Sequence, residues 1–353
     1  MIKAGATIGI VGGGQLGRML AMAAAHMGYR TCIFTPEKDS PASHVATVTI
    51  VADYQDQEAL AQFARQVDVV TFEFENIPPE SLQQLQSRVS VFPDPSVLHI
   101  CRNRLREKHF VQDLGIPTAP FHAVRSLADL REGVKQLGLP CVLKTTELGY
   151  DGKGQVKIES ADTIEAAWEQ LKTGEAVLEG WVPFEREISV IVARDASGST
   201  QAYDPVHNIH RHHILAETHV PAGISDEAAQ KARAVAQAIA SGIGLIGLLA
   251  VEMFLEADGT VRVNELAPRP HNSGHWTLDA AATSQFEQQV RAICGLGLGD
   301  PRALCSAIMY NLIGDEVLSL DAYYSNPQAH IHLYGKREVK AGRKMGHVTV
   351  LGG

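Results

Sequence analysis

The stretch LAVEMFLEADGTVRVNE, residues 249–265, predicts a β-hairpin. Apolar residues alternate on both sides of Asp258-Gly259, and Asp-Gly between two alternating segments is the strongest short-range signal for a two-residue hairpin loop. Counting outward from such a loop sets Phe254 opposite Val263. The sequence therefore predicts two antiparallel strands in one defined register.

The same register sets two carboxylates, Glu252 and Glu265, directly opposite each other. Side chains at such positions lie roughly 5 Å apart, so two carboxylates there repel each other. Mg²⁺ between them would remove the repulsion, and it commonly combines one or two carboxylates with substrate phosphates. The hairpin sequence alone is explained equally well by two acidic residues on a strand edge that faces solvent. The run LAPRPHNSGHW, residues 266–276, favours the metal site, because its Arg, His, Asn, Ser and Gly residues are typical of a site loop.

Composition and charge exclude several classes of protein. The net charge of −9 argues against a general nucleic-acid-binding protein, although a local basic cluster can still bind an anionic substrate. Five cysteines cannot all pair within the chain, which favours reduced thiols. No apolar run approaches the roughly 20 residues of a membrane helix, and the N-terminus leads straight into a predicted strand. We expect a cytoplasmic protein that binds neither nucleic acid nor a membrane.

The order of predicted elements divides the chain of 353 residues into four parts. Residues 1–100 alternate strands and helices, which indicates a doubly wound parallel sheet. Residues 101–182 form a small α+β unit that resembles a lid. Residues 183–300 hold a long strand, a helix and the carboxylate hairpin, and residues 301–353 contain short strands. The expected fold class is α/β together with α+β.

Some element boundaries follow from the same patterns. Apolar runs in the first part predict strands at residues 45–51, 67–74 and 89–92. A charged segment predicts one helix over residues 101–118, which would end at Gly115-Ile116-Pro117 because glycine and proline end helices.

The Gly-rich segment GGGQLG, residues 12–17, fits the pattern G-x-G-x-x-G between a strand and a helix. Backbone N–H groups and a helix N-terminus in such a turn can bind an anion. A dinucleotide site also needs an acidic residue about 20 positions on, at the end of the second strand. Glu37 has that spacing but follows Thr35-Pro36, beyond the strand. We therefore favour a monophosphate site or a plain turn over NAD binding.

A second Gly-rich segment, GYDGKGQ at residues 149–155, lies between two predicted strands. It is not a Walker A loop, because no Ser or Thr follows the lysine. Its glycines allow backbone N–H groups to fold over phosphates, Lys153 adds a positive charge, and Lys144 ends the preceding strand. The two lysines favour a phosphate-binding loop over an ordinary hairpin connection.

Acidic residues also occur at the ends of predicted strands. Glu73 and Glu75 lie on one face of their segment, and ligands of open α/β sheets bind beyond the carboxyl ends of the strands. The segment EGWV, residues 179–182, can offer backbone C=O and N–H groups to a flat base, and Glu187 lies on the next strand. For Glu73, Glu75 and Glu187, the alternative is that each lies on an ordinary polar face of its strand.

Two clusters of basic or imidazole side chains complete the candidate sites. The histidine cluster lacks the Cys or His-Glu spacing that would support a zinc site, and the basic cluster fits a phosphate site or a solvated face equally well. The first consists of His207, His210, His212 and His213, and the second of Lys336, Arg343, Lys344 and His347.

Over nearly its whole length the chain resembles the ATP-grasp enzymes, and among them the family of N5-carboxyaminoimidazole ribonucleotide synthases. The resemblance implies an ATP-grasp fold with an N-terminal pre-ATP-grasp domain, a small lid and a C-terminal mixed domain. The run at 264–277 is the most specific of the segments that carry it. These segments are GGQLG (13–17), FEFEN (72–76), GYDGKGQ (149–155), FEREIS (184–189), NELAPRPHNSGHWT (264–277), YGK (334–336) and RKMGHV (343–348).

The resemblance implies roles by position. The metal ligands would be Glu252 and Glu265, and the catalytic residues Asp151, as the base for the substrate amine, Lys336 and Arg343. The ATP-binding residues would be Arg104, Lys144, Gly149, Tyr150, Asp151, Gly152, Lys153, Gly154, Gln155, Glu179, Gly180, Trp181, Val182, Glu187, His210, Asn264 and Glu265. The substrate-binding residues would be Gln15, Leu16, Glu73, Glu75, Tyr150, Arg269, His271, Asn272, Ser273, Lys336 and Arg343.

In one position the metal site departs from the common ATP-grasp pattern. Many of these enzymes have an Asn two residues after the second metal-binding Glu, whereas this chain has Ala267 there. A regular pleat would turn the nearby Asn264 to the opposite face of the strand.

The implied reaction joins bicarbonate to the exocyclic amine of 5-aminoimidazole ribonucleotide in purine biosynthesis. It converts ATP to ADP and phosphate through carboxyphosphate, needs Mg²⁺, and would be carried out by a homodimer. The nearest competing function is that of a formate-dependent glycinamide ribonucleotide transformylase, for which Asp-Thr-Gly-Met is expected where this chain has Asn272-Ser273-Gly274-His275. Two further functions compete with it: a nicotinamide-dependent oxidoreductase, supported only by residues 12–17, and an ATP-binding regulatory protein without chemistry.

Overall fold

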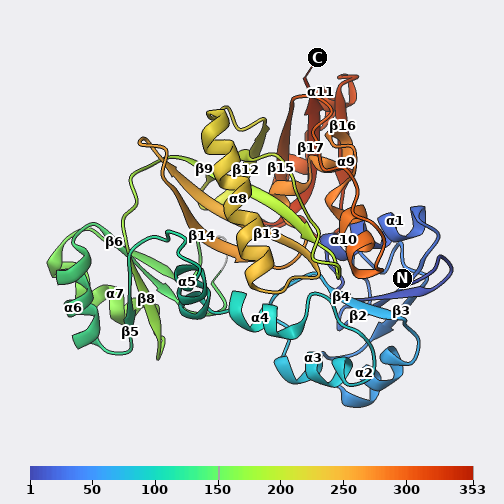
Figure 1. Ribbon diagram of the computed structural model, residues 1–353, viewed down its shortest axis with the longest axis horizontal. Coiled ribbons are helices and arrows are strands. Elements are labelled where there is room, and N and C mark those ends of the chain that lie inside the picture. The colour runs from blue at the N-terminus through green and yellow to red at the C-terminus, as the bar shows by residue number, and fades with distance from the viewer. Residues whose placement is uncertain (150–151, 353) are drawn as a thin grey trace.

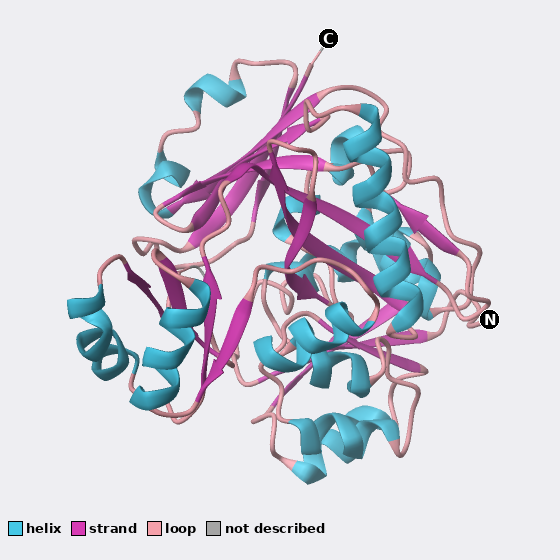
Figure 2. Cartoon of the chain, turned by 60° about the vertical axis from the view of Figure 1, so that its left-hand side comes forward, coloured by secondary structure: helices cyan, strands magenta, loops and turns pink. Residues whose placement is uncertain are grey.

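The chain is described by a computed structural model that covers residues 1–149 and 152–352. These residues form three β-sheets, with helices packed against them (Figure 1). In the turned view of Figure 2 the strands run through the interior, and most helices lie toward the outside. This arrangement confirms the predicted combination of α/β and α+β structure.

The N-terminal part is a four-stranded parallel sheet, as the alternation of strands and helices predicts. Its strands are β1 (Thr7–Val11), β2 (Arg30–Thr35), β3 (Val48–Val51) and β4 (Val69–Phe72), and its helices are α1 (Gln15–His26), α2 (Gln57–Ala64) and α3 (Pro79–Gln86). The strand order is β3-β2-β1-β4, so β1 lies in the middle and its carboxyl end opens into the first Gly-rich turn.

Three predicted strands in this sheet are shorter than expected. The segment 45–51 begins to pair only at β3, because its first backbone N–H groups bond within a turn. The segment 67–74 is reduced to β4. The segment 89–92 is an isolated bridge between Val70 and Val91, because the prolines that follow cannot extend a strand ladder.

The helix predicted over residues 101–118 is present but shorter than expected. It is α5 (Arg104–Asp113), and a separate helix, α4 (Pro95–Cys101), ends just before it. The side chain of Asn103 accepts hydrogen bonds from two backbone N–H groups in the first turn of α5. Asparagine is a strong N-cap, so the chain breaks and restarts its helix at this residue.

The lid is a four-stranded antiparallel sheet that projects at one end of the molecule in Figure 1. It consists of β5 (Phe121–Val124), β6 (Cys141–Thr145), β7 (Gln155–Ile158) and β8 (Ala176–Gly180), with the helices α6 (Leu127–Leu137), η1 (Ala161–Thr163) and α7 (Ile164–Leu171). Lys144 pairs with Gln155 across β6 and β7, so the second Gly-rich segment connects neighbouring strands.

A nine-stranded sheet forms the body of the molecule. Its strands are β9 (Phe184–Arg194), β10 (Thr200–Ala202), β11 (Val206–Arg211), β12 (Ile214–Val220), β13 (Gly247–Glu256), β14 (Val261–Ala267), β15 (Ala307–Ile313), β16 (Ala329–Leu333) and β17 (Lys344–Leu351). The predicted C-terminal strands extend this sheet through the pairing of β12 with β15 instead of forming a separate one. The predicted four-part division of the chain stays a prediction.

The remaining helices flank this sheet. They are α8 (Asp226–Gly242), η2 (Asn272–Gly274), α9 (Thr277–Ala280), α10 (Gln285–Ile293), η3 (Gly314–Leu318) and α11 (Asp321–Tyr324). Ala232, Ala236 and Ile239 of α8 are fully buried against β9 and β13, and their spacing places them on one helix face. In the described part of the chain, no helix has both the length and the apolar character needed to cross a membrane.

The predicted hairpin is formed by β13 and β14, but its loop is longer than expected. The backbone N–H of Glu256 donates to the C=O of Thr260, which leaves a three-residue loop, and Gly259 has a φ of +81°. A glycine at a positive φ is typical of three-residue hairpin loops. Phe254 consequently lies opposite Arg262, one residue away from its predicted partner.

A β-bulge then restores the predicted pairing of the carboxylates. Met253 pairs with Val263 and Glu252 with Glu265, so Asn264 is the extra residue between them. The bulge compensates the one-residue shift from the loop. The predicted pairing of Glu252 with Glu265 is therefore confirmed, although the regular register from which it was predicted is wrong.

Replacing Asn103 by Ala should lower the free energy of unfolding by about 1 kcal/mol, because α5 loses the acceptor for its first-turn N–H groups. Asn103→Ser keeps an oxygen at this position and should lose less. The measurement is urea unfolding of both variants. Equal losses would show that the contact between the Asn103 amide and Glu147 matters more than the cap.

Candidate active site

A cavity of about 430 Å³ lies where the N-terminal sheet, the lid and the central sheet meet. Its wall is mostly charged or polar, as a site for phosphorylated substrates requires. Many residues predicted from the sequence lie in this wall. They are Gln15, Leu16, Glu73, Arg104, Lys144, Gly152, Lys153, Gln155, Glu187, His210, Glu252, Asn264, Glu265, Arg269, His271 and Asn272.

A second cavity of about 310 Å³ adjoins the first. Arg104, Glu265 and Arg269 border both, while Glu75 and Gly149 lie in the second cavity only. Arg269 Nε lies 2.6 Å from Glu75 Oε1, so this ion pair stands at the boundary. The two adjoining cavities therefore share two arginines and one carboxylate.

Other predicted residues lie outside both walls or outside the described part of the chain. Tyr150 and Asp151 belong to the second group. The described residues that line neither cavity are Gly154, Glu179, Gly180, Trp181, Val182, Ser273, Lys336 and Arg343. The other residues of the larger cavity are Phe74 and His275, which the sequence analysis did not single out, and His213 and Lys344, which it placed in the histidine and basic clusters.

The two carboxylates of the hairpin each have a cationic or imidazole neighbour. Glu265 Oε2 lies 3.1 Å from Arg104 Nη1, and Glu252 Oε1 lies 3.1 Å from His271 Nε2. Burial alone would raise the pKa of Glu252, but the hydrogen bond from His271 and the nearby positive charges hold it well below its usual range. Glu252 is therefore ionised at neutral pH.

Asn264 lies in the same cavity wall, which corrects the expectation that it faces away. The bulge breaks the regular alternation of side chains, so that consecutive residues, Asn264 and Glu265, both reach the cavity. The Oδ1 atom of Asn264 is buried and has no hydrogen-bond partner in the described part of the chain. Two carboxylates and a free amide oxygen are ligands that suit a hard divalent cation such as Mg²⁺.

Two lysines share one buried carboxylate beside this group. Glu179 Oε1 lies 2.9 Å from Lys108 Nζ, and Oε2 lies 2.7 Å from Lys144 Nζ. Burial would raise the pKa of Glu179, but the two lysines and Arg104 hold it far below its usual range. The side chain of Glu179 is fully used in these ion pairs. The segment 179–182 could therefore contact an adenine base through its backbone groups.

Lys108 was missed by the sequence analysis. It lies four residues after Arg104 in α5, so both project from one helix face. The sequence showed this spacing, but it could not show that Lys108 pairs with Glu179, because Glu179 lies in β8, far away in sequence.

An ion pair joins Glu187 of β9 to His210 of β11 at another side of the cavity. Burial lowers the pKa of His210, but the hydrogen bond to Glu187 and the negative charges of Glu187 and Glu252 together raise it more, so the net shift is upward. Gly152 lies against His213, and a Cβ at Gly152 would stand 2.5 Å from the His213 Cβ. The second Gly-rich segment thus contacts the turn between β11 and β12.

The first Gly-rich turn holds an anion from its own chain. Backbone N–H groups of Gly14 and Gly17 donate to the two carboxylate oxygens of Glu73, the second at 2.8 Å. Burial raises the pKa of Glu73 despite these bonds. Neither a monophosphate nor NAD is therefore needed to explain this turn, because Glu73 occupies the donors at the N-terminus of α1.

The C-terminal basic cluster reaches the cavity through Lys344. The Nζ of Lys336 donates to the Lys344 backbone carbonyl at 2.7 Å, and burial together with Arg343 lowers the pKa of Lys336 to about 8. Ser273 is fully buried, where its hydroxyl accepts a hydrogen bond from Ser189 at 2.7 Å. Ser273 therefore supports the site loop in this structure.

Family models match the chain along nearly its whole length. The ribonucleotide synthetase preATP-grasp domain matches residues 5–102, the ATP-grasp domain residues 109–286, and the phosphoribosylaminoimidazole carboxylase C-terminal domain residues 307–353.

Curated relatives agree with these models. The chain is 47% identical to the N5-carboxyaminoimidazole ribonucleotide synthase of Brucella melitensis, over 99% of this chain and 97% of that one. It is 45% identical to the bifunctional purine synthesis protein purC/E of Dictyostelium discoideum, of which it spans 37%.

Solved structures share the fold. An ADP complex of N5-carboxyaminoimidazole ribonucleotide synthetase has a TM-score of 0.97 and 46% identity, and the match covers 100% of this chain and 94% of the other. The Aspergillus clavatus synthase in complex with ADP and 5-aminoimidazole ribonucleotide has a TM-score of 0.93 and 32% identity, over 99% and 94% of the two chains.

Replacing Gly12 by Ala should lower the free energy of unfolding by more than about 2 kcal/mol, because strain at positive φ adds to the loss of paired N–H groups. Gly12 has a φ of +113°, and a Cβ there would lie 2.3 Å from Glu73 Cγ. Gly5→Ala is the matched control, since Gly5 has a φ of +90° and no atom within 4 Å of such a Cβ. Thermal unfolding of both measures the difference, and equal losses would contradict the internal role of Glu73.

Proposed function

The chain belongs to the N5-carboxyaminoimidazole ribonucleotide synthase family of ATP-grasp ligases, and from that membership we infer its activity. It is an ATP-dependent ligase of purine biosynthesis that carboxylates 5-aminoimidazole ribonucleotide. The observation that carries this proposal is the cavity that gathers Glu252, Asn264 and Glu265 opposite Arg104 and Lys144.

In the proposed complex, Mg²⁺ is held by Glu252, Glu265 and the Asn264 amide oxygen. Asn264 Oδ1 supports this assignment, because it is an acceptor without a hydrogen-bond partner in the described residues. The ion would shield negative charge on the phosphates when bound. Arg104 and Lys144 are the side chains we assign to the same phosphates.

We assign the remaining nucleotide contacts as the resemblance implies. Lys153 and the glycines around it would close over the phosphates, and backbone groups of residues 180–182 would hold the adenine. Glu187 would bind the ribose, with His210 beside it. The ion pair of these two residues supports the assignment, because it holds both side chains at the cavity wall.

The proposed reaction has two steps. A bicarbonate oxygen attacks the γ-phosphorus of ATP, and the bond to ADP breaks to give carboxyphosphate. The exocyclic amine then attacks the carboxyl carbon, phosphate leaves, and the amine loses a proton. Bicarbonate is a poor electrophile, so the first step supplies the leaving group, and positioning with charge stabilisation provides most of the catalysis.

The carboxylating half of the site is assigned to residues around Arg269, which borders both cavities. Asp151, our candidate base for the amine, and Tyr150 lie outside the described residues. We keep Lys336 and Arg343 as candidates for catalysis. The remaining proposed substrate contacts are Gln15, Leu16, Glu73, Glu75, His271, Asn272 and Ser273.

We also propose, from the family resemblance, that the protein is a cytoplasmic homodimer. Its oligomeric state can be measured by light scattering on the purified protein.

Formation of ADP should require both small substrates. With Mg²⁺-ATP and bicarbonate, adding 5-aminoimidazole ribonucleotide should raise ADP release by at least about tenfold, because the complete set of substrates is needed to position the reacting groups. The rate should fall again when bicarbonate is removed. If glycinamide ribonucleotide with formate stimulates instead, the protein is a transformylase and the carboxylation is not its reaction.

The metal assignment predicts graded losses along the hairpin. Glu265→Gln should lower the turnover rate by at least about 100-fold, since charge-stabilising contacts have effects of this size. Asn264→Ala should raise the Mg²⁺ concentration for half-maximal rate by about tenfold, the effect of losing an interaction of about 1.4 kcal/mol.

Glu256→Gln is the matched control, because Glu256 lies on the same hairpin and pairs with Arg262 outside the cavity. It should leave the Mg²⁺ dependence unchanged. An unaltered Mg²⁺ dependence in both site variants would contradict the assignment.

A further inference from the structure

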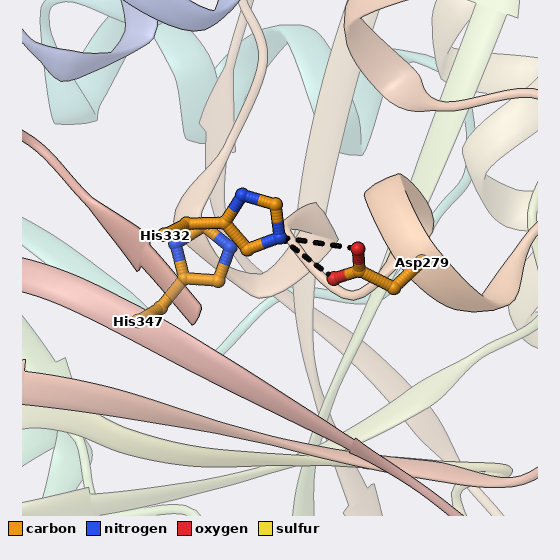
Figure 3. A group of neighbouring side chains, drawn as sticks. All are labelled: Asp279, His332 and His347. Atoms are coloured by element: carbon orange, nitrogen blue, oxygen red, sulfur yellow. Dashed lines mark hydrogen bonds and ion pairs between the residues drawn. The ribbon is translucent and has the colours of Figure 1, made fainter. Parts of the chain in front are cut away.

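A second group of metal-binding side chains lies outside the walls of the two active-site cavities. Asp279, His332 and His347 each offer one ligand atom, and these atoms lie within 4.8 Å of one another (Figure 3). They come from α9, β16 and β17 respectively. His332 Nε2 lies 2.9 Å and 3.1 Å from the two carboxylate oxygens of Asp279.

The two C-terminal strands present their histidines together. His332 pairs directly with His347 across β16 and β17, and their rings stack with centroids 4.5 Å apart. His330 is two residues before His332, so both imidazoles lie on one face of β16. His330 Nδ1 lies 3.6 Å from Asp279 Oδ1. Three imidazoles therefore lie close to one carboxylate.

One ring nitrogen of His347 is buried without a hydrogen-bond partner in the described part of the chain, as a metal ligand requires. Its Nδ1 lies 2.9 Å from the Tyr334 hydroxyl, while its Nε2 is buried and has no hydrogen-bond partner among the described residues. With the proton on Nδ1, donated to the Tyr334 oxygen, Nε2 would carry a lone pair, as in metal-binding histidines oriented by a second hydrogen bond.

We propose that Asp279, His332 and His347 bind a divalent transition metal, with Zn²⁺ as the best fit, and that His330 or a water molecule completes the coordination. Two imidazole nitrogens and a carboxylate oxygen suit Zn²⁺, whereas Mg²⁺ prefers oxygen ligands. Zinc lies about 2.0 Å from such atoms, which places tetrahedral ligands about 3.3 Å apart. Metal binding would therefore draw the three ligand atoms, which lie within 4.8 Å of one another, closer together.

The position of this site gives it a structural consequence. Asp279 follows the site loop that contains Arg269, and the segment between β16 and β17 contains Lys336 and Arg343. A metal ion bound by Asp279 and by the histidines of β16 and β17 would link the C-terminal strands to the loop of the active site. The ring centroid of His347 lies 4.7 Å from that of His275, which lines the larger cavity, so the metal site is close to the cavity wall.

The test is zinc binding to the full chain in the presence of excess Mg²⁺, which occupies the carboxylate hairpin. After removal of metals with a chelator, equilibrium dialysis and elemental analysis should find one Zn²⁺ per chain. Co²⁺ at the same site should give the visible absorption of a four-coordinate ion, and bound Zn²⁺ should raise the midpoint of thermal unfolding.

Variants separate this site from other histidines. His332→Gln and Asp279→Asn should each lose the bound Zn²⁺ equivalent. Tyr334→Phe should weaken binding about 10- to 100-fold, as loss of an orienting partner does. The matched control is His219→Gln, because His219 Nε2 also lies 3.0 Å from a carboxylate oxygen, that of Glu217, but outside the cluster.

Circular dichroism would verify the fold of each variant, and Asp279→Asn decides the question if His332→Gln does not fold. The proposal is overturned if the unaltered chain binds no Zn²⁺ in excess Mg²⁺, or if both cluster variants keep the full equivalent. It is also overturned if His219→Gln removes the ion while the cluster variants retain it.

Discussion

Two carboxylates that face each other across one hairpin repel each other, so they need positive charge around them. This requirement explains the cationic and imidazole side chains that surround the pair. Arg104 lies beside Glu265, and His271 lies beside Glu252. A third carboxyl group, Glu107, is buried nearby and accepts the backbone N–H of Leu266 at 2.8 Å. Burial and Glu265 raise the pKa of Glu107 to about 8, so it is mostly protonated at neutral pH. Protonation of Glu107 thus removes one negative charge from the neighbourhood of Glu265.

The sequence predicted the classes of sheet and the two facing carboxylates. It predicted only part of the backbone geometry that brings these carboxylates together. Alternation and Asp-Gly were sufficient for a hairpin, whereas loop length and bulge position depend on packing between strands. The N–H to C=O bond from Glu256 to Thr260 lengthened the loop, and the bulge at Asn264 reversed the shift. Similarly, the helix in the charged segment begins only after Asn103, because the Asn103 side chain caps its first turn.

The candidate site was predictable where its residues are close in sequence, and less so where they come from distant segments. The run 264–277 contributes six residues to the cavity, and all except His275 were predicted as site residues: Asn264, Glu265, Arg269, His271, Asn272 and His275. The salt bridge of Lys108 with a strand of the lid, and the entry of Lys344 into the cavity, depend on tertiary structure that spacing does not reveal. The clusters around His213 and Lys344 were recognised, but their periodicity did not show which members face inward.

The internal use of the first Gly-rich turn changes where phosphates can be held. Helix N-termini are common anion sites, but the N–H groups of Gly14 and Gly17 already bind Glu73. In the proposed assignment, the phosphates of ATP are instead held by Arg104 from α5, by Lys144 from the lid and by the second Gly-rich segment. Lys144 is joined through Glu179 to Lys108 of α5, so one buried ion-pair network links the lid to that helix. If Lys144 binds phosphate as proposed, phosphate binding and the position of the lid would be coupled, because Glu179 pairs with Lys144 and also connects the lid to α5.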